Sequence, residues 1–157
     1  MLEVKKDYKE LLELLNEKRV EYLIVGAYAL AFHGHPRFTG DIDILVNSTD
    51  ENAEKIIETL NEFGFESLGL KPCDFTEPDN IIQLGFSPIR IDFLTSIDGV
   101  TWDEAQKGAA AGTYGDIPVK YLGKNEYIKN KKASGRLKDL ADIEEITRGY
   151  LIQSSLN

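Results

Sequence analysis

Two aspartates separated by one residue, Asp41 and Asp43, are the residues of this sequence best placed to do chemistry. With Ile42 between them, they open an apolar run over 44–46 that is typical of a buried strand. Side chains at positions i and i+2 of a strand point to the same face, with Cα atoms about 6.5 Å apart. Their carboxylates can therefore converge on one hard cation such as Mg²⁺.

The same pair has an electrostatic cost that something must offset. Two unpaired carboxylates at the start of a buried strand repel each other and resist desolvation. A metal ion or cationic side chains would remove that cost. The alternative is that both aspartates cap backbone N–H groups at the mouth of the strand.

The elements that must position these aspartates follow from hydrophobic spacing. It predicts helices over residues 5–18 and 27–32, and near 124–132 and 136–150. A further helix, capped by Ser48 or Asp50, should run to about residue 63, and residues 101–107 should form a helical turn. It predicts strands over 22–25, 41–46, 81–86 and 89–95 and a hairpin over 113–119, and it leaves 66–80 as a loop or a short irregular strand. This order indicates one α+β domain over residues 1–157.

Composition limits the classes of function. The net charge is −9, from 18 basic and 27 acidic residues, which argues against extended nucleic-acid binding because that needs a broad cationic surface. No apolar run approaches the length of a membrane-spanning helix, and the first residues lack the pattern of a signal peptide. The single cysteine, Cys73, excludes an internal disulfide and fits a cytoplasmic location; no role is assigned to it.

The segment from Val25 to Asp43, VGAYALAFHGHPRFTGDID, resembles the signature of minimal nucleotidyltransferases of the polymerase-β superfamily. That group includes the nucleotidyltransferase components of toxin–antitoxin and abortive-infection systems. Its pattern is a strand, a Gly-Gly or Gly-Ser turn, a short helix and an Arg-x-Thr-x-Asp-x-Asp strand. The strong resemblance covers residues 22–46, and a weaker one covers Asp92 and residues 131–146. It implies the nucleotidyltransferase fold, a mixed central β-sheet flanked by helices with a helical C-terminus.

The resemblance also implies a site and a reaction. Asp41, Asp43 and Asp92 would hold Mg²⁺ or Mn²⁺, and Asp92 could accept the proton of an attacking hydroxyl. The Gly26-Ala27 turn would hold phosphate at the start of a helix. The implied activity is transfer of a nucleoside monophosphate from an NTP to an acceptor hydroxyl of unknown identity. Ala27 departs from the Gly-Ser turn of many active members, so the hydroxyl contact with phosphate is missing.

The same resemblance assigns further residues to nucleotide binding: Arg37, Thr39, Lys131, Lys138 and Asp142. All of them except Thr39 have an alternative role. Arg37 could instead neutralise Asp41 or Asp43. The basic stretch 124–138, of local charge +5, could be a solvated helix face, and Lys138 with Asp142 could be a surface ion pair.

Several single residues, and the function itself, also have a second interpretation. Asp92 could be a solvent-facing partner of Arg90, two residues earlier on the same strand face. His33 and His35 have no companion ligand in the sequence, so a zinc site is not expected and a loop or helix-end role is favoured. The second functional hypothesis is a nucleotide-binding or regulatory protein without turnover, such as one half of a toxin–antitoxin pair. A homodimer or a cognate partner would suit so small a chain.

Overall fold

The structure is a computed structural model that describes residues 2–135, 141, 143–144 and 146–147. Its helices are α1 (Lys6–Glu17), α2 (Gly26–Phe32), α3 (Asp50–Leu60), α4 (Trp102–Lys107) and α5 (Lys124–Ser134). Its strands are β1 (Tyr22–Val25), β2 (Asp41–Val46), β3 (Ile81–Leu84), β4 (Arg90–Leu94), β5 (Ala110–Tyr114) and β6 (Ile117–Tyr121).

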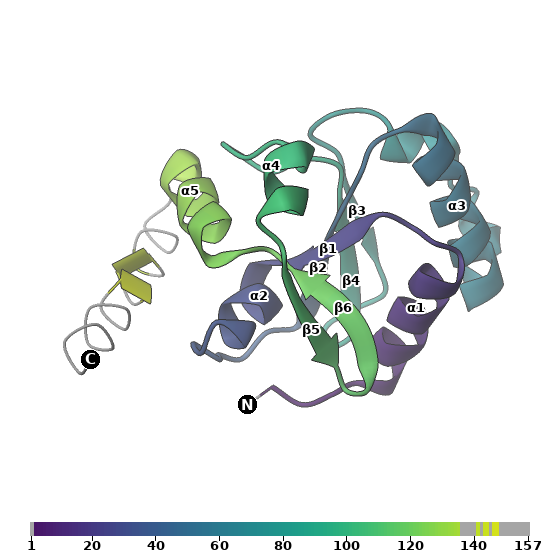
Figure 1. Cartoon of the computed structure of the whole chain (residues 1–157). Coiled ribbons are helices and arrows are strands. Elements are labelled where there is room, and N and C mark those ends of the chain that lie inside the picture. Colours follow the sequence, from purple (N-terminus) through teal and green to yellow (C-terminus); the bar gives the residue numbers. More distant parts are fainter. Residues whose placement is uncertain (1, 136–140, 142, 145, 148–157) are drawn as a thin grey trace.

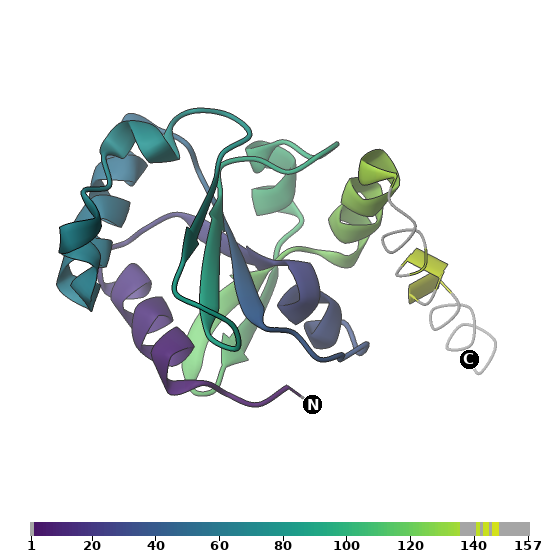
Figure 2. The same ribbon diagram turned by 180° about the vertical axis from the view of Figure 1, so that it is seen from behind.

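The six strands form one mixed sheet in the order β3-β4-β2-β1-β6-β5. The pairs β2–β4 and β1–β6 are parallel, and the others are antiparallel. Helices α1 and α3 lie on one side of the sheet, while α2 and α5 lie on the other (Figures 1 and 2). This mixed sheet flanked by helices confirms the predicted fold class.

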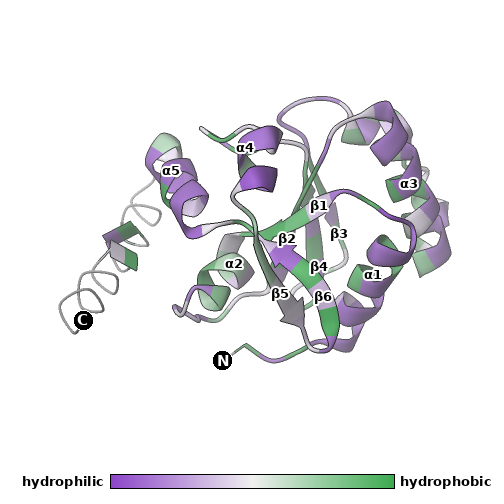
Figure 3. Cartoon of the chain, in the orientation of Figure 1, coloured by the Kyte–Doolittle hydropathy of each residue, from purple (hydrophilic) through white to green (hydrophobic). Residues whose placement is uncertain are grey.

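The core lies where the apolar spacing predicted it. All four residues of β1 are buried, and α1 buries Tyr8, Leu11, Leu12 and Leu15 completely. The hydropathy colouring shows the strands of the sheet mostly apolar and the outer faces of α1 and α3 polar (Figure 3). Helix α5 is polar along most of its length and buries one residue, Tyr127.

The chain between α3 and β3 differs from the prediction. Thr49, and neither Ser48 nor Asp50, caps α3, since its side chain accepts from the N–H of Asn52. After Leu60 the chain passes through a π-helical turn over 61–65, then through 3₁₀ turns over 66–68 and 72–75. Phe75 is fully buried, which ties this segment to the core although it has no sequence periodicity.

The β5–β6 hairpin is longer than predicted, because its pairing runs from Ala110 opposite Tyr121 to Tyr114 opposite Ile117. At the other end of α5, Gly135 adopts a left-handed conformation, φ 67°, at the predicted helix break. The predicted helix 136–150 lies almost wholly outside the described residues. Within the described part of the chain, no helix is long and apolar enough to cross a membrane.

Candidate metal–nucleotide site

The parallel pairing of β2 with β4 brings the three predicted carboxylates together. Asp43 lies opposite Asp92, and Asp41 lies opposite Arg90. Because residues two apart on a strand share a face, these four side chains form a two-by-two group on one face of the sheet. One oxygen from each of the three carboxylates lies within 4.8 Å of the others, close enough to share a cation.

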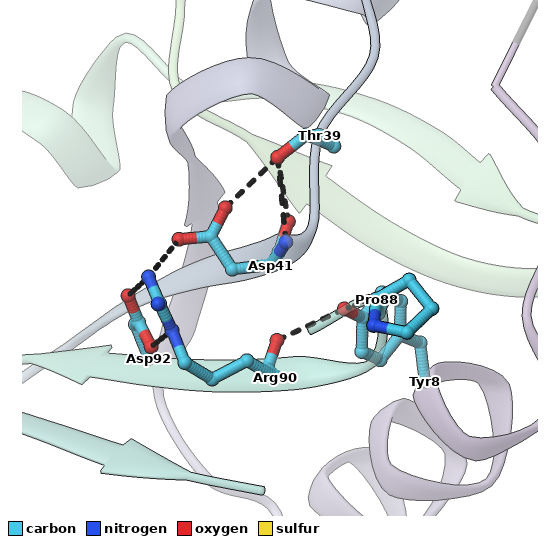
Figure 4. A network of polar contacts seen from close by, with 6 residues as sticks. All are labelled: Tyr8, Thr39, Asp41, Pro88, Arg90 and Asp92. Carbon is cyan, nitrogen blue, oxygen red and sulfur yellow. Dashed lines mark hydrogen bonds and ion pairs between the residues drawn. The ribbon is translucent and has the colours of Figure 1, made fainter. Parts of the chain in front are cut away.

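Hydrogen bonds occupy two of the three carboxylates (Figure 4). Arg90 Nε donates to Asp92 Oδ1 at 2.9 Å, and Arg90 Nη2 donates to Asp92 Oδ2 at 3.0 Å and to Asp41 Oδ2 at 2.8 Å. The Thr39 hydroxyl donates to Asp41 Oδ1 at 2.8 Å. The capping alternative for Asp41 and Asp43 is not seen among the described residues, because Asp41 accepts from side chains and no backbone N–H donates to the Asp43 carboxylate.

These contacts set the proton affinities of the two carboxyls. Burial works against the charged form of Asp41, but the hydrogen bond from Thr39, the contact with Asp92 and the Arg90 charge together hold the pKa of Asp41 below its ordinary value. Burial raises the pKa of Asp92, although Arg90 opposes that effect. As the pH rises, Asp41 therefore loses its proton before Asp92 does.

Asp43 is the carboxylate that the fold leaves unsatisfied. No hydrogen-bond donor among the described residues reaches it, whereas its two neighbours have donors. Burial, followed by the charges of Asp41 and Asp92, raises its pKa to about 7. An unsatisfied carboxylate beside two others is a donor set that suits Mg²⁺ or Mn²⁺, which take oxygen ligands.

Gly26, at the first position of α2, touches this carboxylate. Its φ is +65°, a left-handed conformation that glycine adopts without steric cost. A Cβ placed there would lie 2.1 Å from Asp43 Oδ2 and 3.0 Å from Asp43 Cγ. The turn between β1 and α2 therefore needs glycine for two reasons, its backbone conformation and its close approach to Asp43.

A cleft of about 710 Å³ opens over the carboxylates. Of the predicted site residues, those that line it are Gly26, Ala27, Arg37, Thr39, Asp41, Asp43, Asp92 and Lys131. The cleft is also lined by Asp79, Ser96, Asp98 and Asn130. Lys131 is placed by α5, where its Nζ lies 5.3 Å from the centre of the Tyr127 ring. Lys138 and Asp142 lie outside the described residues.

The structure tests two single-residue expectations, for Asp92 and for His33, and adds one residue to the site. Asp92 does pair with Arg90, but it is 5% exposed, so the solvent-facing pair considered as its second interpretation is wrong. His33 Nε2 lies 2.8 Å from the Leu122 carbonyl, which gives it a helix-end role. Arg90 was not predicted to belong to the site; its only signal in the sequence was the i, i+2 spacing from Asp92.

Known proteins resemble this chain in fold and in sequence family. A crystal structure from Thermotoga maritima, of a protein whose assignment as a nucleotidyltransferase is itself a proposal, matches with a TM-score of 0.55 at 15% identity, over 96% of this chain and 90% of that one. A lincosamide antibiotic adenylyltransferase, solved with lincomycin bound, matches with a TM-score of 0.52 at 14% identity, over 91% of this chain and 96% of that one. At these identities the likeness shows the fold. No protein of curated function matches the sequence.

A sequence-family model extends the comparison beyond fold. The model of aminoglycoside-2''-adenylyltransferases matches residues 7–132. That range runs from α1 into α5 and contains the whole sheet with its three carboxylates. The chain belongs to the aminoglycoside-2''-adenylyltransferase family, and it is a nucleotidyltransferase-like protein.

Proposed function

We propose that this protein transfers a nucleoside monophosphate from an NTP to a hydroxyl of a small cationic acceptor, in a reaction that requires a divalent ion. The observation that carries the proposal is the convergence of Asp41, Asp43 and Asp92 on the wall of a cleft, in a chain of an adenylyltransferase family. The family favours ATP as the donor.

Asp41, Asp43 and Asp92 would hold Mg²⁺ or Mn²⁺. The fit rests on Asp43, whose carboxylate lacks a donor among the described residues and lines the cleft. A bound divalent ion would offset the charge of the triphosphate and of the oxygens that attack and leave. The protein's own contribution is then largely positioning and electrostatics.

The proposed reaction is an in-line displacement at the α-phosphorus. The acceptor oxygen forms a bond to that phosphorus while the bond to the bridging oxygen of the β-phosphate breaks, and pyrophosphate leaves with the electron pair. The proton of the acceptor hydroxyl passes to a carboxylate oxygen of Asp92. Burial suits Asp92 to this role because it raises the pKa of the carboxyl.

The nucleotide would bind at the cationic residues of the cleft. Arg37 and Lys131 line the cleft and can face phosphate oxygens. Gly26 and Ala27 begin α2, whose start has no side-chain cap, so their N–H groups remain available to phosphate. Thr39 would act through Asp41, to which its hydroxyl donates. Lys138 and Asp142 remain predicted nucleotide contacts.

The acceptor would bind in the cleft beside Asp79 and Asp98. Among the described residues, five aspartates and two cationic residues line the cleft, and a metal would offset the charge of Asp41, Asp43 and Asp92. Asp79 and Asp98 remain as carboxylates able to pair with amino groups. This excess of negative charge supports a cationic acceptor, and the family name points to an aminoglycoside hydroxyl.

A second candidate function is nucleotide binding without turnover, as in a regulatory protein or one half of a toxin–antitoxin pair. The observation in its favour is Ala27, which lacks the hydroxyl that many active members carry at this turn. Such a protein would bind nucleotide through the same cleft, and activity would need a cognate partner or would be absent.

The test measures pyrophosphate release from each NTP with Mg²⁺, with a panel of aminoglycosides and with lincomycin, and identifies the modified acceptor by mass spectrometry. Release that needs an acceptor and is lost in Asp43→Ala supports transfer. Asp116→Asn is the control, since this aspartate pairs with Lys9 and has a side chain that is 77% exposed. Nucleotide binding without release for every acceptor would favour the second candidate, and absence of nucleotide binding would refute both.

A further inference from the structure

We propose that Arg90 is a positioning residue that holds the metal-binding carboxylates of Asp41 and Asp92 in place from outside the cleft. The inference rests on the proposed metal site and goes beyond it, because it assigns the order of that site to a residue that would bind neither metal nor nucleotide.

The guanidinium of Arg90 fixes both carboxylates at once. Its Nε and Nη2 form a two-point contact with the two oxygens of Asp92, at 2.9 and 3.0 Å, and Nη2 also reaches Asp41 Oδ2 at 2.8 Å. The fork of an arginine is planar and rigid, so a two-point contact sets the orientation of a carboxylate as well as its position. The resulting bridge joins β2 to β4 (Figure 4).

The backbone of Arg90 is held as firmly as its side chain. The hydroxyl of Tyr8, a residue with no exposed surface, donates to the Arg90 carbonyl at 2.9 Å. The Arg90 N–H donates to the Gly40 carbonyl at 3.3 Å. The start of β4 is therefore hydrogen-bonded to α1 and to the residue that precedes Asp41. These bonds fix the backbone position from which the Arg90 side chain extends.

Arg90 contacts two of the carboxylates without lining the cleft itself. Asp41, Asp43 and Asp92 line the cleft, whereas Arg90, which the structure also describes, does not. A carboxylate offers about four lone-pair sites on its two oxygens. The two contacts of Arg90 with Asp92 use one site on each oxygen, so the remaining sites are available to an ion in the cleft while the arginine stays bound.

This arrangement separates positioning from stabilisation. The Arg90 side chain is 35% exposed, and ion pairs with that much solvent contact add little to stability. By contrast, groups that orient metal ligands typically change metal affinity about 10- to 100-fold when they are replaced. Metal affinity, rather than the free energy of unfolding, is therefore the quantity that reports this role.

The experiment measures Mn²⁺ affinity without nucleotide, by titration calorimetry at pH 8, for wild type, Arg90→Lys and Arg19→Lys. Arg90→Lys keeps the positive charge and removes the planar fork, so we expect its affinity to fall at least tenfold. Arg19→Lys is the matched control: it makes the same change at an exposed arginine that does not line the cleft, and we expect a change of less than threefold.

The outcomes separate the two proposals. If wild type binds Mn²⁺ and the affinity of Arg90→Lys is higher or falls by less than threefold, the role of Arg90 is overturned and the metal site is left intact. No Mn²⁺ binding by wild type at millimolar concentrations overturns the metal site and the role of Arg90 together. A purely structural role of Arg90 would shift the unfolding midpoint of Arg90→Lys and leave its Mn²⁺ affinity unchanged.

A measurement on the wild-type chain covers the case in which Arg90→Lys does not fold. The sequence contains five arginines, so the Nε–H signals in a ¹⁵N NMR spectrum are few and can be assigned through bonds. We expect the Arg90 Nε–H to remain protected from exchange when Mg²⁺ and ADP are added together. Loss of that protection would mean that the ion displaces the arginine, and it would overturn the proposal.

Discussion

Replacing Gly26 with alanine tests whether the turn before α2 is built around Asp43. Two costs are expected, and the structure separates them. An alanine at φ +65° is strained by about 1–2 kcal/mol. Its Cβ would also lie 2.1 Å from Asp43 Oδ2, and pushing a packed group aside typically costs about 1–3 kcal/mol more.

Gly69 provides the matched control for this substitution. Its φ is +66°, almost identical to that of Gly26, but a Cβ there would meet no atom within 4 Å. Gly69→Ala should therefore lose only the strain of about 1–2 kcal/mol, measured by urea unfolding. Gly26→Ala should lose about 2–5 kcal/mol in the same assay, from both costs together.

A double-mutant cycle identifies the partner of the added methyl group. Asp43→Ala removes Oδ2 and Cγ and leaves its Cβ, 3.1 Å from the position that the alanine methyl would take. In that background Gly26→Ala should cost little more than Gly69→Ala does. Equal losses at Gly26 and Gly69 in the wild-type background would refute the reasoning, as would a Gly26→Ala loss that Asp43→Ala leaves unchanged.

Three further predictions concern the charge and the framework of the site. The pKa of Asp43 is raised to about 7, so a metal ion must displace a proton from this carboxyl below neutral pH. Mn²⁺ affinity should therefore rise about tenfold from pH 6 to pH 8. Calorimetry that shows no pH dependence of this affinity would contradict the prediction. Since the folded chain then holds a proton that the unfolded chain releases near pH 4, the metal-free protein should lose stability as the pH rises from about 4 to 7, and Asp43→Asn should remove that loss. Tyr8→Phe removes the hydroxyl that donates to the Arg90 carbonyl and should lower the free energy of unfolding in urea by about 1–3 kcal/mol. The control Tyr121→Phe loses a hydrogen bond to the Thr113 carbonyl and should lower it by a similar amount. Only Tyr8→Phe should also weaken Mn²⁺ binding.

Local sequence was sufficient for the central strands. The run from Tyr22 to Val25 is apolar without a break and is buried at every position, as a strand covered on both faces must be. In β2 the apolar Ile42 and Ile44 are buried, whereas Asp41 and Asp43 are only partly buried, as alternation predicts. The β5 strand, by contrast, starts in an Ala-rich segment with no strand pattern, and its pairing with β6 fixes it.

The part of the site that sequence could not supply is the register between β2 and β4. The residues of β2 and β4 do not by themselves determine that Asp43 lies opposite Asp92, because the pattern of each strand is compatible with several alignments. A shift of one residue would move Asp92 to the other face of the sheet. The role of Arg90 depends on the same register, and for that reason its spacing from Asp92 indicated a strand face and not a bridge to Asp41.

The structure also changes which residue carries the argument for a metal. From sequence, an Asp-x-Asp pair on a buried strand needs a cation, and either a metal or a side chain would serve. Arg90 supplies that cation to Asp41 and Asp92, so those two carboxylates alone would be explained by an ion pair within the protein. Asp43 is not explained in this way, because no described residue donates to it and burial raises its pKa. The evidence for a metal therefore lies in the residue that the arginine does not reach, and Asp43 is the residue whose replacement decides the question.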